Sequence, residues 1–242
     1  MKKVLVMLAV LALFGFALAQ EATQFKAADG LAIYANFYPA QGRSKATILA
    51  FHQAGSSKGE YATIAPRLSK LGFNVLAVDQ RSGGKTPESE NETVKNNGWK
   101  LSSYLEALPD LEAALEWVKS DERTKGSKLI AWGSSYSASL VFLLAQKHPE
   151  INAVMAFSPS DSYLEQSGLV WNAAKSVRSS VFIACTPDEA FDVKSIFNLV
   201  SHKNKIFFVP KNAGIHGSNA LNVPISSKEY WAATEQFLAW FK

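Results

Sequence analysis

The sequence predicts an α/β fold with a mainly parallel central sheet, and two observations carry this prediction. Short apolar runs alternate with segments whose apolar residues recur at helical spacing. Before them, strand-like runs at residues 23–28 and 31–38 flank Asp29-Gly30, a two-residue turn signal for an antiparallel hairpin. Strands that alternate with helices usually pair in parallel, with helices on both faces of the sheet.

The N-terminal residues 1–19 are predicted to be a secretory signal peptide. The chain starts with Met1-Lys2-Lys3, continues with a nearly uninterrupted apolar run, and reaches the cleavage signal Ala17-Leu18-Ala19. The apolar run is short for a membrane span. We therefore expect a secreted or periplasmic protein whose residues 20–242 form one domain, without a membrane anchor after cleavage.

The elements follow in order after the hairpin. Residues 61–71, 104–118, 191–200 and 227–240 are predicted to be helices, as is the segment that follows Ser135 up to Pro149. The segment 85–99 is polar and is predicted to be a surface loop, and 158–179 is a mixed connection. Short, continuous apolar runs predict buried strands at 46–51, 73–78, 129–132, 151–157, 181–184 and 205–209.

Charge and cysteine content exclude several classes. The formal net charge of +4 falls to +2 when Lys2 and Lys3 are removed with the signal, which is too small a bias to argue for nucleic acid or an anionic membrane as a partner. Cys185 is the only cysteine, so no internal disulfide is possible. Its expected role is packing in the core.

The segment KLIAWGSSYSAS, residues 128–139, organises the rest of the chain. A buried strand ends at Gly133, and a helical pattern begins just after Ser135, so the turn reads G-x-S-x-small with Ser137 in the last position. A strand-to-helix turn this tight requires small residues on either side of its centre and holds the central side chain exposed. Ser135 is therefore the candidate nucleophile, and the alternative is a turn that serves close packing only.

A serine nucleophile needs a base, and His216 is the best placed of four histidines. It lies between Gly214 and Gly217, directly after the last predicted strand, where a loop can carry the ring over the sheet edge. His202 is at the wrong end of that strand, and His148 ends the helix that begins at the serine. His52 follows an early strand and is expected to brace its loop.

The acid that orients the base should follow the strand 181–184. Asp188 and Glu189 both fit, and we prefer Asp188 for its shorter side chain and spacing while keeping Glu189 as the alternative. These acids could equally serve only to start the following helix. Two N–H groups are expected to bind the oxyanion: that of Tyr136 after the nucleophile, and that of Ala54, with Gln53 as the next choice, in the loop after the first parallel strand.

The order Ser135, Asp188 or Glu189, His216 resembles the α/β-hydrolase superfamily, and three more stretches extend the resemblance over nearly the whole chain after residue 19. FHQAGS is similar to that superfamily's His-Gly oxyanion loop, VDQRSGG to its D-x-R-G-x-G stretch, and GIHGS to its catalytic-histidine loop. The size and the absence of a lid resemble small carboxylesterases and dienelactone hydrolase-like members. Those dienelactone hydrolases use a cysteine nucleophile, and Ser135 in that position favours a serine esterase.

The resemblance implies hydrolysis of small-molecule carboxylic esters through an acyl-enzyme. The sequence has no metal-ligand cluster and no phosphate-binding loop, so we expect no cofactor and no metal. The connection 158–180 is too short for a cap domain, so we expect an open site with aromatic lining from Trp99, Tyr136, Tyr163 or Trp171. Gln53 and Ser137 stand where the family pattern has glycines. The alternatives are a small serine peptidase or acyltransferase of the same fold, or a binding protein that has lost turnover; the oligomeric state is left open.

Overall fold

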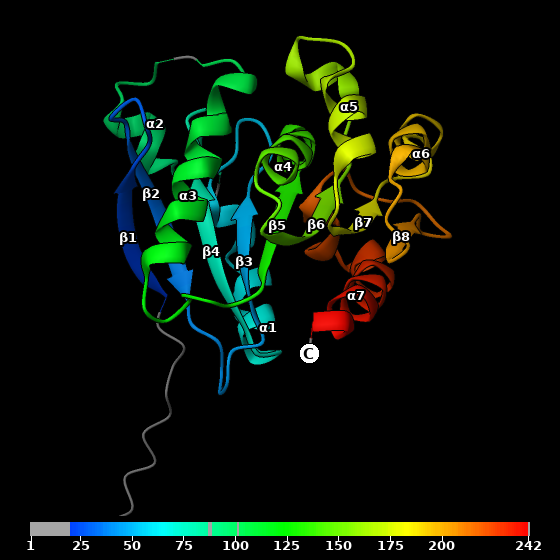
Figure 1. The fold of residues 1–242 in the computed structure, drawn as a ribbon, viewed down its shortest axis with the longest axis horizontal. Coiled ribbons are helices and arrows are strands. Elements are labelled where there is room, and N and C mark those ends of the chain that lie inside the picture. The colour runs from blue at the N-terminus through cyan, green and yellow to red at the C-terminus, as the bar shows by residue number, and fades with distance from the viewer. Residues whose placement is uncertain (1–19, 87–88, 101, 242) are drawn as a thin grey trace, which may run out of the picture.

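The computed structural model describes residues 20–86, 89–100 and 102–241, so the predicted signal peptide lies outside the described residues. Eight strands form one sheet in the order β1-β2-β4-β3-β5-β6-β7-β8 (Figure 1). The strands are β1 (Glu21–Lys26), β2 (Ala32–Tyr38), β3 (Ala46–Phe51), β4 (Phe73–Asp79), β5 (Leu129–Ser134), β6 (Ile151–Phe157), β7 (Ser180–Ala184) and β8 (Lys205–Phe208).

Helices connect the strands. The α-helices are α1 (Ile64–Lys70), α2 (Glu92–Asn96), α3 (Leu108–Ser120), α4 (Tyr136–Lys147), α5 (Leu169–Ser176), α6 (Ala190–Leu199) and α7 (Pro224–Leu238). Short 3-10 helices are η1 (Lys58–Tyr61), η2 (Leu105–Ala107), η3 (Asp161–Leu164), η4 (Ser218–Leu221) and η5 (Ala239–Phe241). None of the helices within the described ranges is long and apolar enough to cross a bilayer.

The predicted fold class is confirmed. β1 and β2 pair antiparallel, β2 also pairs antiparallel with β4, and every later pair is parallel. All residues of β3, β4 and β5 are buried, which explains why these strands read as continuous apolar runs rather than as alternating patterns.

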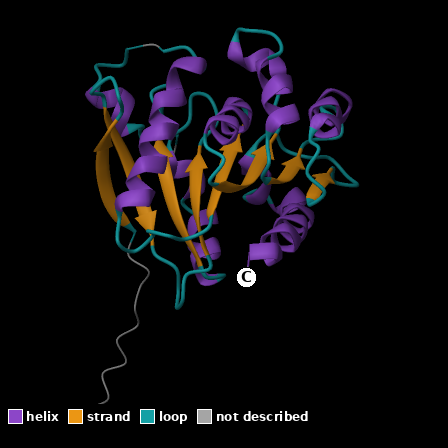
Figure 2. Cartoon of the chain, viewed as in Figure 1, coloured by secondary structure: helices purple, strands orange, loops and turns teal. Residues whose placement is uncertain are grey.

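Helices cover both faces of the sheet (Figure 2). Alternate residues of each strand point to opposite faces. Leu49 and Leu76 pack in the core beneath α3, α4, α5 and α6, whereas Ile48 and Val75 pack in the second core with α1 and α7. The sheet lies between these two apolar layers, so these strand side chains on both of its faces are buried.

The order in which successive strands are added to the sheet changes direction at β3. The chain runs from β3 to its neighbour β4, then crosses back to place β5 on the other side of β3. In open parallel sheets, the loops at such a reversal separate at the carboxyl ends of the strands and leave a crevice for ligands. The loop after β3 and the turn after β5 therefore face each other there.

Three segments refine the predicted elements. The polar segment 85–99 contains the short helix α2, whose start is capped by the Asn91 side chain accepting from the Val94 N–H. The predicted helix at 61–71 begins only at Ile64, which places Pro66 in the first turn, where its missing N–H is not needed. The described connection 158–179 contains η3 and α5 and no cap domain.

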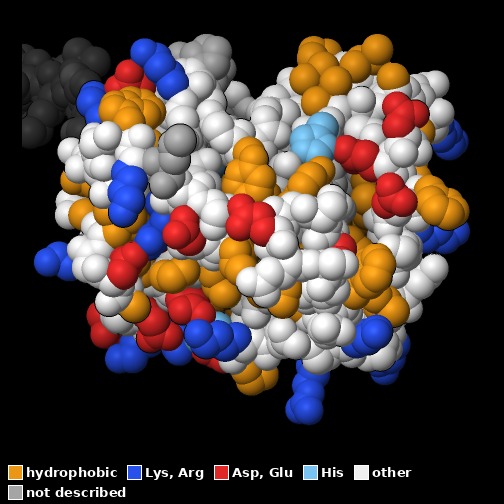
Figure 3. Space-filling view, turned by 90° about the horizontal axis from the view of Figure 1, so that it is seen from above, with side chains coloured by type: hydrophobic (Ala, Val, Ile, Leu, Met, Phe, Trp, Pro, Cys, Tyr) orange, Lys and Arg blue, Asp and Glu red, His pale blue; other side chains and the backbone are white. Residues whose placement is uncertain are grey.

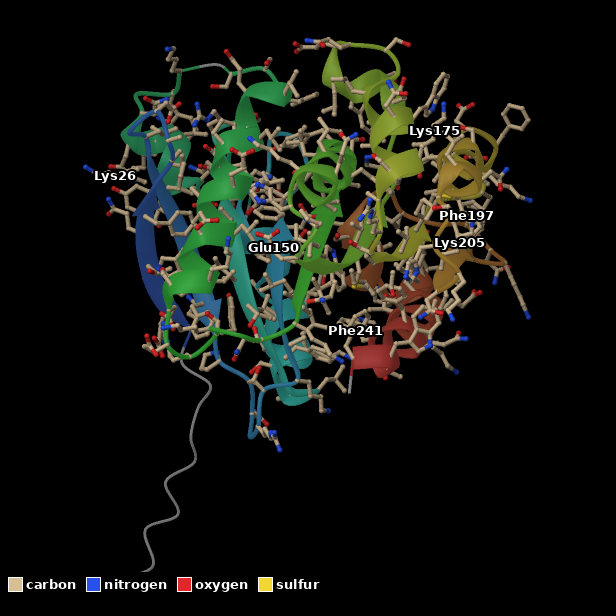
Figure 4. All side chains as sticks on the ribbon, viewed as in Figure 1. Lys26, Glu150, Lys175, Phe197, Lys205 and Phe241 are labelled. Carbon is tan, nitrogen blue, oxygen red and sulfur yellow. The ribbon has the colours of Figure 1, made fainter. Side chains whose placement is uncertain are left out.

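The sheet ends at β8, and a lysine ties this edge strand to the neighbouring helix. Lys205 Nζ donates to the carbonyl oxygens of Phe197 and Val200 at the end of α6, and lies 4.5 Å from the centroid of the Phe197 ring. Figure 4 labels Phe197 and Lys205 close together at this edge. These contacts fix α6, whose first turn follows the loop that carries Asp188 and Glu189.

Candidate active site

Ser135 lies in the strained turn that the sequence predicted between β5 and α4, but it is buried, with 8% of its surface exposed, whereas an exposed side chain was expected. Its backbone has φ 58° and ψ −123°, a conformation that residues with a side chain rarely adopt. The Ser135 N–H donates to the Phe157 carbonyl at 2.8 Å, which fixes the turn against the end of β6. The side chain stands at the N-terminus of α4, where the helix dipole favours developing negative charge.

Gly133 is required by the close approach of strand and helix. A Cβ atom at this position would lie 2.2 Å from the carbonyl oxygen of Ser137. Because that oxygen belongs to the backbone of α4, it cannot move away without a shift of the helix.

We expect Gly133→Ala to destabilise the protein by at least about 3 kcal/mol, the upper part of the range for overpacking a core. Urea unfolding followed by circular dichroism would measure this. Gly126→Ala is the matched control, because it has open space around its Cβ and φ of +77°, so it should cost only about 1–2 kcal/mol. Equal losses in the two variants would contradict the steric account.

Ser137, which replaces the glycine of the family pattern, fastens α4 to two loops. Its hydroxyl donates to the His52 carbonyl at 2.6 Å and accepts from Gln80 Nε2 at 2.6 Å. Gln80 Nε2 also donates to the Tyr136 hydroxyl at 3.0 Å. The serine thus makes buried hydrogen bonds beneath the nucleophile turn that a glycine could not make.

The structure brings His216 to Ser135. The His216 Nε2 lies 2.8 Å from Ser135 Oγ, although 81 residues separate them in sequence. The ring is 40% exposed, and the Tyr163 ring meets it edge-on with centroids 6.5 Å apart. Gly217 follows with φ +70°, and a Cβ there would lie 2.5 Å from Ser134 Oγ, so only glycine lets the histidine loop lie this close to β5.

Glu189, and not Asp188, contacts the histidine. Glu189 Oε1 lies 2.5 Å from His216 Nδ1. Our preference for Asp188 is therefore corrected. The chain turns after β7 with the Glu189 N–H bonded to the Thr186 carbonyl, which folds the Glu189 side chain back over the strand ends and leaves Asp188 exposed to solvent.

The second carboxylate oxygen of Glu189 accepts two hydrogen bonds. Oε2 accepts the Ser158 hydroxyl at 2.6 Å and the Thr186 N–H at 3.0 Å. Burial acts to raise the pKa of Glu189, but the hydrogen bonds from His216, Ser158 and Thr186 outweigh it and lower the pKa to about 2. The group is thus an anion throughout the neutral range.

Ser158 was missed in the sequence. It has φ 57°, and its hydroxyl accepts the Gly217 N–H at 3.1 Å while it donates to Glu189, so it joins the acid to the histidine loop. The available signal was its position directly after β6, the strand beside the nucleophile strand.

The N–H groups of Tyr136 and Ala54 lie where oxyanion donors are expected, after β5 and after β3. Among the hydrogen bonds of the described residues, neither N–H has an acceptor. The N–H of Gln53, our next choice, is occupied, because it donates to Glu60 Oε2 at 2.8 Å. This leaves Ala54 as the candidate second donor.

The remaining histidines are apart from the nucleophile. His52 is fully buried: its Nδ1 donates to the Gln53 carbonyl at 2.8 Å, and its Nε2 accepts the Gln80 N–H at 3.1 Å. Burial lowers the pKa of His52, so it braces the loop as a neutral ring. His148 lies beside Glu112 and Glu150, and His202 contacts Asn204.

Cys185 is buried at the end of β7, and burial raises the pKa of its thiol to about 12. It is therefore a protonated packing residue rather than a nucleophile. Within residues 20–86, 89–100 and 102–241, no cluster of three or more His, Cys, Asp or Glu side chains has the arrangement of a metal site.

The edge of the sheet that carries these residues is open. Figure 3 looks onto it and shows histidine surface beside acidic side chains, with hydrophobic areas on either side. Gly55, Trp99 and Tyr104 help to line a cavity of about 610 Å³ next to the loop after β3. The Tyr104 ring stacks on Tyr136 at 4.5 Å, which places this cavity beside the residue that follows the nucleophile. Trp171 lines a different cavity with Ser160 and Asp192.

Comparisons with known proteins agree with this architecture. The structure is similar to the esterase Pf2001 of Pyrococcus furiosus, with a TM-score of 0.72, 17% identity and 92% of each chain covered. It is similar to a dienelactone hydrolase from Anabaena variabilis, also with a TM-score of 0.72, at 15% identity over 91% of this chain and 97% of that one. A search of curated proteins found no significant match. A family model described as "Serine aminopeptidase, S33" matches residues 42–205, and the chain therefore belongs to this hydrolase family with the α/β-hydrolase fold.

Proposed function

We propose that the protein is an exported serine hydrolase that cleaves small carboxylic esters through an acyl-enzyme. The observation that supports this most is the chain of hydrogen bonds from Glu189 through His216 to Ser135, at the N-terminus of α4. Export is inferred from the predicted signal at residues 1–19. The esterase and dienelactone hydrolase among the similar structures are consistent with an ester as substrate.

The proposed reaction begins with attack of Ser135 Oγ on the ester carbonyl carbon, while the hydroxyl proton passes to His216 Nε2. Glu189 holds the imidazole by its Nδ1–H and stabilises the imidazolium that forms. The carbonyl oxygen becomes an oxyanion, which the N–H groups of Tyr136 and Ala54 stabilise. Collapse of the tetrahedral intermediate expels the alcohol, which takes the proton from His216.

A water molecule completes the cycle. It gives a proton to His216 and attacks the acyl carbon, and the second tetrahedral intermediate releases the carboxylic acid as Ser135 recovers the proton. The half-exposed His216 ring allows water to enter without a lid movement. The cavity beside Tyr104 gives room for the acyl or alcohol part of the ester.

Covalent labelling of the purified protein by a fluorophosphonate probe, with hydrolysis of p-nitrophenyl acetate, tests the proposal. We expect both reactions, and prior labelling should abolish hydrolysis stoichiometrically. A series of p-nitrophenyl esters with longer and aromatic acyl groups would then define the substrate. A protein that is neither labelled nor active on any of them would instead be a binding protein on a hydrolase scaffold.

The family description favours peptide hydrolysis as a second candidate function. The same nucleophile, base and oxyanion donors can cleave an amide. Amino-acid p-nitroanilides distinguish the two: a kcat/KM higher for these amides than for the matched esters would favour the peptidase.

A further inference from the structure

Glu60 is a buried carboxyl group next to the proposed site that has no part in the reaction described above. The residue belongs to η1 and is 3% exposed. Its Oε2 accepts the Gln53 N–H at 2.8 Å, whereas its Oε1 is buried without a hydrogen-bond partner among the described residues. Burying a carboxyl group with one oxygen unpartnered is costly, so the group is a candidate for a role beyond packing.

The residues on either side of Glu60 in η1 are held by buried contacts, which restrict the position of the Glu60 side chain. Lys58 pairs through its Nζ with Asp79 at 2.6 Å and with Glu92 at 2.7 Å, and its N–H donates to Asp79. The Tyr61 hydroxyl donates to the Phe51 carbonyl at the end of β3. Buried ion pairs and hydrogen bonds of this kind hold one geometry closely.

The Glu60 carboxylate occupies one of the two candidate donors in the loop after β3. Because Glu60 takes the Gln53 N–H, that group is not free to bind an oxyanion, and the N–H of Ala54 is left without an acceptor among the described residues. We propose that Glu60 is a positioning residue that holds the oxyanion loop through the Gln53 N–H, so that the Ala54 N–H faces the carbonyl attacked by Ser135. This inference rests on the proposed ester hydrolysis.

The strength of this hold depends on the protonation of Glu60. Burial raises the pKa of Glu60 to about 7, although Ser134, Ser56, the Gln53 N–H and the charge on His216 each lower it. A hydrogen bond to a carboxylate is roughly twice as strong as one to a neutral acceptor, so protonation weakens the grip on the loop.

Three other titratable side chains near Glu60 keep one charge state around neutral pH. Tyr61, on the same element, has its pKa raised well above its ordinary value. Lys58 is held as a cation by Asp79 and Glu92, and His52 in the loop is a buried neutral ring. His216, the proposed base, is present in both wild type and Glu60→Gln, so it does not distinguish their pH profiles.

The pH dependence of kcat/KM on p-nitrophenyl acetate therefore tests the proposal on the unaltered protein. We expect kcat/KM to fall more steeply with decreasing pH in wild type than in Glu60→Gln, because only wild type gains a proton at position 60. Glu189, with its pKa of about 2, does not contribute to this range. Glu60→Gln keeps the size of the side chain but cannot ionise, so its acid limb should be shallower and its kcat at high pH should be lower than in wild type.

Glu60→Ala removes the acceptor, and we expect kcat to fall by about 10²-fold with little change in KM, the scale of a roughly 1 Å misplacement of a reacting group. Exposed Glu116 on α3 provides the control variant Glu116→Gln, which should behave as wild type. Acid limbs of equal steepness in wild type and Glu60→Gln, or Glu60 variants with unchanged kcat, would overturn the proposal.

An NMR titration separates this failure from a failure of the proposed function. The amide proton of Gln53 should shift with pH near 7 in wild type and not in Glu60→Gln, whether or not the protein hydrolyses esters. A Gln53 amide that does not titrate in wild type contradicts the hold by Glu60. Absence of fluorophosphonate labelling in a protein whose Gln53 amide does titrate contradicts the ester hydrolysis, and with it a catalytic role for the hold.

Discussion

Ser135→Ala is expected to abolish covalent labelling by a fluorophosphonate and to lower kcat for p-nitrophenyl acetate by about 10⁶-fold, the scale seen when a serine nucleophile is removed. The variant keeps the turn, because alanine at φ 58° carries about the same backbone strain as serine and packs no larger side chain. Its loss of activity would thus be chemical. Mass spectrometry of the labelled protein and stopped assays over long times would measure both effects.

The residual activity of Ser135→Ala carries information as well. The N–H groups of Tyr136 and Ala54 stay in place, so a small enhancement over water is expected to survive. Ser176→Ala is the control, since Ser176 is an exposed serine at the end of α5. Labelling that persists in Ser135→Ala, while Ser176→Ala is labelled as wild type, would exclude Ser135 as the nucleophile.

The sequence predicted the fold because the strongest patterns are also the most buried. β3, β4 and β5 are buried along their whole length, and such strands have a continuous apolar sequence that propensity and length can recognise. The nucleophile turn was visible for a similar reason: Gly133 has no space for a side chain, so the small residue is dictated by the backbone.

The choice of acid could not be predicted, because it depends on the direction of a single turn. Asp188 and Glu189 are adjacent in the sequence. If the turn were one residue shorter or longer, the other of the two side chains would lie over the strand ends. The structure selects Glu189 through the bond between its N–H and the Thr186 carbonyl, and no residue pattern encodes that bond. Asp188 was preferred for its short side chain, whereas the longer Glu189 side chain reaches Thr186, Ser158 and His216 together.

Polar residues that position other residues could not be predicted from the sequence either. Ser158 and Glu60 make contacts with segments 59 and 7 residues away, Gly217 and Gln53 respectively, and each contact involves a backbone N–H that every residue carries. The helix α2 was missed because it is short and Val94 is its only apolar residue, so it has the Asn91 cap but no apolar face with helical spacing.

Glu189→Gln should lower kcat by about 10⁴-fold, while Asp188→Asn should leave it unchanged. The reason lies in the contacts of the second carboxylate oxygen. The Thr186 N–H can only donate, so in the variant the amide oxygen must occupy its side, which turns the amide NH₂ toward His216 Nδ1. The imidazole would then carry its proton on Nε2, facing Ser135, and could not accept the serine proton.

The pair of variants is its own control, because Asp188 is exposed and Glu189 is its neighbour in the same turn. Fluorophosphonate labelling rates and p-nitrophenyl acetate turnover should fall together in Glu189→Gln, and thermal unfolding should show that the variant remains folded. Should Asp188→Asn lose activity while Glu189→Gln keeps it, the loop after β7 would have to rearrange when substrate binds. The hydrogen bonds of Glu189 to Ser158 and Thr186 argue against that rearrangement, because all of them would have to break for Asp188 to replace it at the histidine.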